Sequence, residues 1–256
     1  SLGLEQSFVQ YKDQLSNLAD YLPIKNIIHR IPDDHLKKPI IITALYFKYQ
    51  MPEVQAKIYG EFGWNLNRTT FRNWLIQPDK GLGSVLGFSK LFNSNNHYWE
   101  FLAEMSNLQL QTRAEQFSTN SPSSWYLGSY VRQGYTNNGQ IIGAGIGPGA
   151  TSQTLEINWR KAKNRIGISA ERRLHNNDFY VFSFTNSGDF RRWYVDFATT
   201  LKIDWTLGAW DINPLISYIQ TNNYNWWLFQ PAESLYFVPG KDKQQFLVQF
   251  NFIYHF

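Results

Sequence analysis

Apolar and polar residues alternate along much of the chain, and the alternation is most regular near its end. From residue 246 onward every second position is Phe, Val or Tyr, and the positions between them are mostly Gln, Asn or His. The same period of two recurs at 41–50, 56–64, 98–106, 155–160, 165–173 and 192–202. Successive side chains of a β-strand point to opposite faces, so this period predicts strands with one apolar and one polar face.

We predict ten strands, at residues 2–11, 39–50, 55–64, 83–92, 96–107, 152–162, 164–174, 190–202, 204–220 and 244–256. Long connections, at 12–38, 65–82, 108–151, 175–189 and 221–243, alternate with short turns, one of them near Ile203 and Asp204. Short turns on one rim and long extracellular loops on the other are typical of bacterial outer-membrane barrels. We therefore expect residues 1–256 to form one all-β domain, a transmembrane antiparallel up-and-down β-barrel.

The alternative all-β fold is a soluble sandwich, whose inner face prefers Val, Ile and Leu. Here the apolar positions are rich in Trp, Phe and Tyr, which favours a lipid-facing surface with aromatic girdles. The charged residues within strands would then face the lumen. They are Lys57, Glu61, Glu100, Glu104, Glu156, Arg160, Arg165, Glu171, Arg173, Arg192, Asp196 and Lys202. We expect them to form a cross-strand lattice of ion pairs, or alternatively a constriction that selects charged sugars or ions.

Composition agrees with this interpretation. Aromatic residues make up 17% of the chain, which excludes a disordered protein. No apolar stretch approaches the ~18 residues that a membrane-spanning helix needs. The chain has no cysteine, which excludes disulfides and thiolate metal sites. The net charge of +4 is spread along the sequence, so nucleic acid is not an expected partner.

Several motifs resemble the Wzi-like outer-membrane capsule assembly family. They are YGEFG at 59–63, LGFSKL at 86–91, QGYTNNGQ at 133–140, GAGIGPG at 143–149 and ERRLHNNDFY at 171–180. The resemblance covers most of residues 39–256. Two departures lie in the connection at 65–82. Leu66-Asn67 stands where the family has Asp-His, and Pro78-Asp79-Lys80-Gly81-Leu82 replaces a Pro-Glu-His-Ser-Arg-like segment.

This resemblance implies an outer-membrane protein that binds or anchors capsular or surface polysaccharide and is not an enzyme. Family barrels have roughly eighteen strands, so the chain is expected to be the C-terminal part of a larger barrel, and a complete ten-stranded barrel is the alternative. The implied partners are polysaccharide, outer-membrane lipid and lipopolysaccharide, the barrel-assembly machinery and another chain or segment that completes the barrel. No cofactor or metal is expected.

Sugars offer apolar ring faces to aromatic side chains and hydroxyls to amides, carboxylates and guanidinium groups. The expected glycan-binding residues lie in the long loops. They are Trp125, Tyr126, Tyr130, Arg132, Tyr135, Asn137, Asn138, Asn176, Asn177, Asp178, Trp226 and Trp227. Packing between the loops, or a place in the interfacial girdle, is the alternative for each of them. Phe252, Tyr254 and Phe256 resemble the C-terminal signal for barrel insertion.

The sequence gives little support for phosphate binding, glycosidase catalysis or metal binding. The glycines at 143–149 lack the Lys-Ser/Thr pair of a phosphate loop. Glu100 and Glu104 lie ~13 Å apart on a strand, too far for a glycosidase pair. The five histidines have no metal-like spacing. A porin-like channel for small solutes or saccharides, an outer-membrane hydrolase and a scaffold subunit of a larger envelope complex stay open as alternatives.

Overall fold

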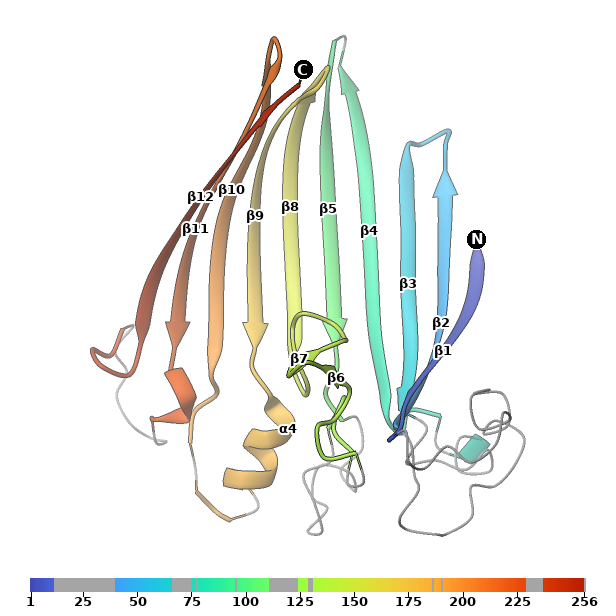
Figure 1. The fold of residues 1–256 in the computed structure, drawn as a ribbon, viewed down its shortest axis with the longest axis vertical. Coiled ribbons are helices and arrows are strands. Elements are labelled where there is room, and N and C mark those ends of the chain that lie inside the picture. Colours follow the sequence, from blue (N-terminus) through green and yellow to red (C-terminus); the bar gives the residue numbers. More distant parts are fainter. Residues whose placement is uncertain are drawn as a thin grey trace.

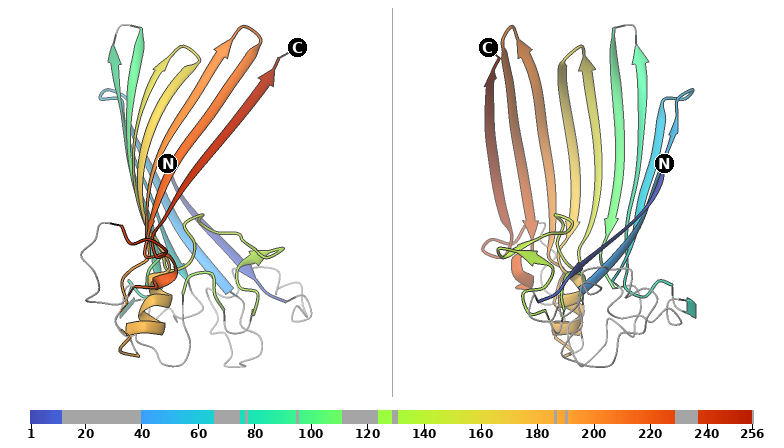
Figure 2. Two further views of the ribbon diagram at one scale, coloured as in Figure 1. Left: turned by 90° about the vertical axis from the view of Figure 1, so that its left-hand side faces the viewer. Right: turned by 45° about the vertical axis from the view of Figure 1, so that its right-hand side comes forward.

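The structure is a computed structural model that describes residues 1–11, 40–65, 75–76, 78–94, 96–110, 124–128, 131–185, 187–189, 191–228 and 237–255. Ten long strands form one antiparallel sheet, in which every strand pairs with its neighbours along the chain (Figure 1). Figure 2 shows this sheet as a twisted and curved wall. The prediction of an all-β fold is confirmed.

The ten strands of the sheet are β1 (Leu2–Val9), β2 (Ile40–Met51), β3 (Ala56–Asn65), β4 (Leu82–Ser94), β5 (His97–Asn107), β8 (Thr151–Lys161), β9 (Asn164–Leu174), β10 (Val195–Leu207), β11 (Trp210–Asn222) and β12 (Lys243–Tyr254). The short strands β6 (Thr136–Asn137) and β7 (Gln140–Ile141) form a separate hairpin. The described residues also include the short helical segments α4 (Asn177–Tyr180), η4 (Val181–Thr185) and η5 (Tyr224–Trp226). None of the described helices is long and apolar enough to cross a membrane.

The sheet is not closed. Among the described strands, β1 pairs only with β2 and β12 pairs only with β11, so both form open edges. Short turns join β2 to β3, β4 to β5, β8 to β9 and β10 to β11 at one end of the sheet, and the helical segments and the small hairpin lie at the other end (Figure 1). All ten predicted strands are present, eight of them close to the predicted positions. The other two, β10 and β11, begin five and six residues later than the predicted residues 190 and 204.

One predicted turn is wrong. We expected the chain to reverse near Ile203 and Asp204, but these residues pair with Ile166 and Arg165 inside the sheet. The chain turns five residues later, between Leu207 and Trp210. Gly208 has a φ of +61° there, a left-handed conformation that glycine adopts without steric cost and that tight hairpins require.

The registers between strands assemble the apolar positions into one continuous face. A single row across six strands shows this alignment: Phe101, Ile157, Ile168, Leu201, Ile216 and Val248. Ile168, in the middle of that row, is 53% exposed. No second layer of the described chain covers this face, and a contiguous apolar surface of this extent requires an apolar environment or a partner.

The opposite face is polar and internally hydrogen-bonded. The ring of Tyr59 on β3 lies over Gly87 on β4, where an added Cβ would overlap the ring. The Tyr59 hydroxyl then donates to Glu104 on β5 across 2.6 Å. Glycine within a strand often marks such a close approach. This single contact therefore ties three strands together on the polar face.

We predict that Gly87→Ala lowers the free energy of unfolding by about 1–3 kcal/mol, because the new methyl group displaces the Tyr59 ring. The matched control is Gly145→Ala, where an added Cβ would have no atom within 4 Å. Urea unfolding of the purified protein measures both variants. Equal midpoints for the two would contradict this role of Gly87.

Candidate functional site

A cleft of about 270 Å³ lies on the polar face of the sheet, at the end that carries the long connections. We call it the inner cleft and define it by Glu5, Glu61, Trp125, Tyr126 and Tyr135. The two glutamates come from β1 and β3, and the three aromatic residues come from the connection between β5 and β8. The cleft therefore forms where this connection folds back over the polar face of the first strands.

Two facing glycines allow this approach. Gly63 on β3 and Gly83 on β4 are register partners. An added Cβ on Gly83 would lie 2.8 Å from Cζ2 of Trp125, and one on Gly63 would lie 3.0 Å from its Cη2. The indole ring of Trp125 thus rests directly on the backbone of two strands, which explains why glycines interrupt both.

The connection has a small hydrophobic core of its own. Leu108, Trp125 and Tyr126 are buried together, and Tyr126 stacks on Tyr135 with ring centroids 5.9 Å apart. The Tyr135 hydroxyl contacts the Ser7 hydroxyl on β1 at 2.8 Å, which fastens the connection to the sheet. The side chains at the edge of the cleft are therefore held in place.

Trp125 and Tyr126 are only 4% and 7% exposed, so their rings support the cleft and do not present a free face to a sugar. The Tyr126 hydroxyl accepts the Ala144 N–H at 3.0 Å. Burial raises its pKa, the Ala144 hydrogen bond lowers it, and the charge of Glu61 raises it again. The net direction is upward, so this hydroxyl stays protonated at neutral pH.

The Glu5 and Glu61 carboxylates of the inner cleft are available for a ligand. Glu5 and Glu61 are exposed, and within the described part of the chain neither carboxylate has a hydrogen-bond or ion-pair partner. The Trp125 Nε1 is buried without a hydrogen-bond partner among the same residues. Two exposed acceptors therefore border the cleft, whereas the Trp125 donor is enclosed. Carboxylates of this kind can accept hydrogen bonds from the hydroxyls of a sugar.

The charged residues predicted to line one face of the sheet mostly do so, and many are paired. The pairs are Glu100–Arg160 at 2.9 Å, Glu156–Lys202 at 3.1 Å, Glu171–Arg173 at 2.7 Å, Arg165–Asp204 at 2.7 Å and Asp196–His175 at 2.7 Å. Lys57 lies over the Tyr59 ring. The prediction did not include Asp204 and His175, which pair with predicted members.

Arg192 does not belong to this set. We expected it in a strand with its side chain on the polar face, but β10 begins at Val195, so Arg192 precedes the strand and alternation does not apply to it. It lines a second pocket, together with Arg172 and Phe197. Those two residues lie on the apolar face.

The other predicted glycan residues divide into exposed and structural groups. Arg132, Asn137 and Asn138 are exposed around the β6–β7 hairpin, and Trp227 is also exposed. Asn176 caps α4 by accepting the Phe179 N–H. Asn177 is the first residue of α4 and is half-buried. Tyr130 lies outside the described residues.

The predicted C-terminal insertion signal is described in part. Phe252 and Tyr254 lie exposed on the apolar face of β12, whereas Phe256 lies outside the described residues.

Asp178 holds together two long connections, the one between β5 and β8 and the one between β9 and β10. It is 4% exposed and accepts the Leu110 N–H at 2.9 Å and the Ser124 hydroxyl at 2.6 Å. Asp178 lies in α4, after β9, and its carboxylate therefore fixes the connection between β5 and β8, which covers the inner cleft. This is a structural role between loops, the alternative that the sequence left open for each predicted glycan-binding residue.

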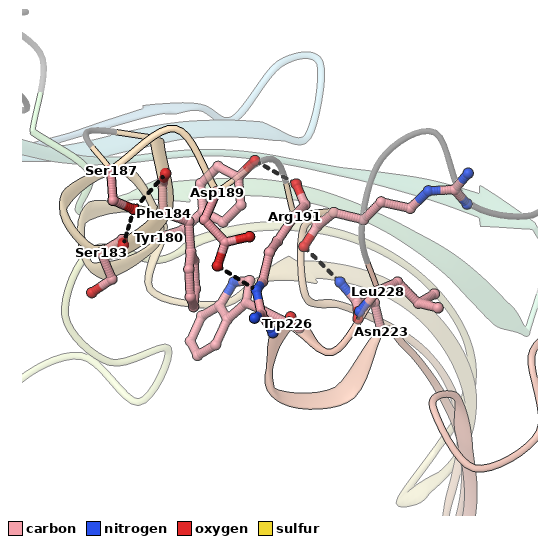
Figure 3. Close-up of polar contacts among 10 residues, drawn as sticks. Tyr180, Ser183, Phe184, Ser187, Asp189, Arg191, Asn223, Trp226 and Leu228 are labelled. Carbon is pink, nitrogen blue, oxygen red and sulfur yellow. Dashed lines mark hydrogen bonds and ion pairs between the residues drawn. The ribbon is translucent and has the colours of Figure 1, made fainter.

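Figure 3 shows the polar contacts around Trp226. Arg191 bridges Asp189, at 2.9 Å, and the Trp226 carbonyl, at 3.1 Å, while the Tyr180 hydroxyl donates to the Arg191 carbonyl at 2.6 Å. The Trp226 ring packs on Phe184 and other aromatic residues. These contacts join the helical segment to η5, so Trp226 is also a packing residue.

No three His, Asp or Glu side chains of the described residues are close enough to hold a metal ion. No family model, curated protein or solved structure matches the chain. The geometry of the two faces and of the inner cleft is therefore the basis for a functional proposal.

We predict that Asp178→Ala loosens the connection over the inner cleft and costs about 2–4 kcal/mol, because two buried donors lose their acceptor. Hydrogen exchange should accelerate at 108–110 and 124–128 and stay unchanged in the middle of β9. Asp79→Ala, at an exposed turn of the same rim, is the control. Unchanged exchange at 124–128 would show that Asp178 does not hold this connection.

Proposed function

We propose that this chain forms the wall of an outer-membrane β-barrel and binds a hydroxyl-rich surface polysaccharide through the inner cleft, as its resemblance to the capsule assembly family implies. The observation that carries the proposal is the continuous exposed apolar face opposite a polar, ion-paired face. A bilayer covers such a face with lipid, whereas water would leave it unstable.

The dimensions of the strands support a membrane setting. The nine strands other than β1 contain 10–13 residues, and a transmembrane strand needs about 9–11. Aromatic residues gather on the apolar face near the short turns, where Phe92 pairs with Trp99 and Trp210 packs on Tyr254 at 4.8 Å. Aromatic residues at the ends of the strands are typical of the interfacial girdle of outer-membrane barrels.

The open edges impose one further requirement on the proposal. Lipid offers no hydrogen-bond partner to the free N–H and C=O groups of β1 and β12. Both edges must therefore pair with strands in the membrane, either with each other or with further strands.

The charge of the inner cleft narrows the class of polysaccharide. Glu5 and Glu61 accept hydrogen bonds from sugar hydroxyls but repel carboxylates and phosphates. A neutral or amino-sugar-containing polysaccharide therefore fits better than one rich in uronic acids.

The membrane setting is tested by a pair of neighbouring substitutions. Ile168→Arg places a charge on the apolar face in mid-strand and should cost about 2–4 kcal/mol in a bilayer. Ser169→Arg places the same charge on the polar face and should be tolerated. Heat-modifiable protein in the outer-membrane fraction measures the amount of folded barrel. Equal yields of the two variants would contradict lipid contact at this face.

Polysaccharide binding is tested by Glu5→Ala/Glu61→Ala, with Glu53→Ala in an exposed turn at the other rim as the control. The double variant should weaken binding roughly tenfold, since about 1.4 kcal/mol of hydrogen-bond energy is lost. Isothermal titration of purified protein with polysaccharide from the source organism measures the affinity. No saturable binding by the unmodified protein, together with ion conductance in a planar bilayer, would favour a porin-like channel.

A further inference from the structure

Tyr46 on β2 is an exposed aromatic side chain on the polar face of the sheet. Its register partners are Gly3 on β1 and Glu61 on β3, and Glu61 lines the inner cleft. The Tyr46 side chain is 44% exposed. Among the described residues of the ten-stranded sheet, leaving aside the edge strand β12, the other exposed large apolar side chains all lie on the apolar face. The exposure of an aromatic ring at this one place on the polar face therefore needs an explanation.

Tyr46 continues the floor of the inner cleft. Ile42 and Ala44 precede it on the same face of β2, and both line the cleft. Two residues of an antiparallel strand span about 7 Å, which is room for one further sugar ring. A ligand that fills the inner cleft and extends along the strands toward the short turns would therefore meet Tyr46 next.

The ring of Tyr46 is supported by the backbone of β1. An added Cβ on Gly3 would lie 2.2 Å from Cζ of Tyr46 and 2.3 Å from its hydroxyl oxygen, so the ring occupies the space above this glycine. Glycine within a strand often marks such a close approach. The ring therefore extends along the surface of the sheet, and the part that is exposed is open to the polar side.

Tyr59 shows how the same arrangement differs when its role is structural. Its ring lies over Gly87, but it is half-buried and its hydroxyl donates to Glu104 on a third strand. Tyr59 is therefore used to fasten strands, whereas Tyr46 presents an exposed apolar surface beside the inner cleft.

We propose that Tyr46 is a stacking subsite for a sugar ring, so that the bound polysaccharide continues from the inner cleft along the polar face of β2. This inference rests on the proposed function and adds to it the direction in which the polysaccharide runs. The apolar C–H face of a sugar ring packs on an aromatic ring. The Glu61 carboxylate, on the adjacent strand, accepts hydrogen bonds from the hydroxyls of the same sugar chain.

The test is isothermal titration of the full chain, purified in mild detergent, with short and long oligosaccharides prepared by partial hydrolysis of the surface polysaccharide of the source organism. Tyr46→Ala should weaken binding of the long oligosaccharides roughly fivefold, which corresponds to about 1 kcal/mol, because the stacking surface is lost. Tyr46→Phe keeps the ring and should bind as the unmodified protein does. Tyr49→Ala is the matched control, since Tyr49 is an exposed tyrosine on the apolar face of the same strand, and it should leave binding unchanged.

Oligosaccharide length separates this inference from the proposed function. The shortest oligosaccharides fill only the inner cleft, so Glu5→Ala/Glu61→Ala should weaken their binding and Tyr46→Ala should not. Heat-modifiability checks that each variant is folded, and Tyr46→Leu replaces Tyr46→Ala if the alanine variant does not fold.

Three results would overturn the stacking subsite and leave the proposed function intact. They are unchanged binding of the long oligosaccharides by Tyr46→Ala, an equal loss in Tyr46→Phe, and an equal loss for short and long oligosaccharides. No saturable binding of any oligosaccharide by the unmodified protein would overturn the subsite and the proposed polysaccharide binding together.

Discussion

The register between neighbouring strands is the constraint on which the rest of this structure depends. Side chains on a strand alternate between faces, so a shift of one residue in any pairing would move charges onto the apolar face and aromatic residues onto the polar face. The observed pairings avoid this for most positions, as the row from Phe101 to Val248 shows for six strands. Lys90 and Arg172 are exceptions, since their register partners Phe101 and Phe197 lie on the apolar face. The cross-strand ion pairs follow from the same registers, since they can form only where partners of opposite charge lie side by side.

The two ends of the sheet differ in how their strands are connected. Short turns keep adjacent strands in register at one end, and Gly208 shows how a single left-handed residue does this. At the other end, the long connections fold over the rims of the strands, and most of the buried hydrophobic side chains of the described residues lie there, among them Ile40, Leu110 and Val131. Binding chemistry is therefore expected at this end, where loops of variable composition rest on a rigid scaffold.

Local pattern predicted ten strands and most of their faces, because a period of two needs only neighbouring residues. It misplaced the turn between β10 and β11 and put Arg192 in a strand. It could not predict which loop side chains are buried. Trp125 and Asp178 looked like candidates for sugar contact, but one rests on two glycines and the other holds two connections together. Glu5 was not predicted at all, since it comes to share a cleft with Glu61 only through two successive pairings, of β1 with β2 and of β2 with β3.

The inner cleft differs from the rest of the polar face in the state of its carboxylates. Glu100, Glu156 and Glu171 on that face each have an arginine or lysine partner. Glu5 and Glu61 have no hydrogen-bond or ion-pair partner within the described residues, although both line a cleft covered by the connection between β5 and β8. Stiffening of the sheet by ion pairs therefore explains the first group but not these two carboxylates, which makes Glu5 and Glu61 the candidate ligand-binding groups of the polar face.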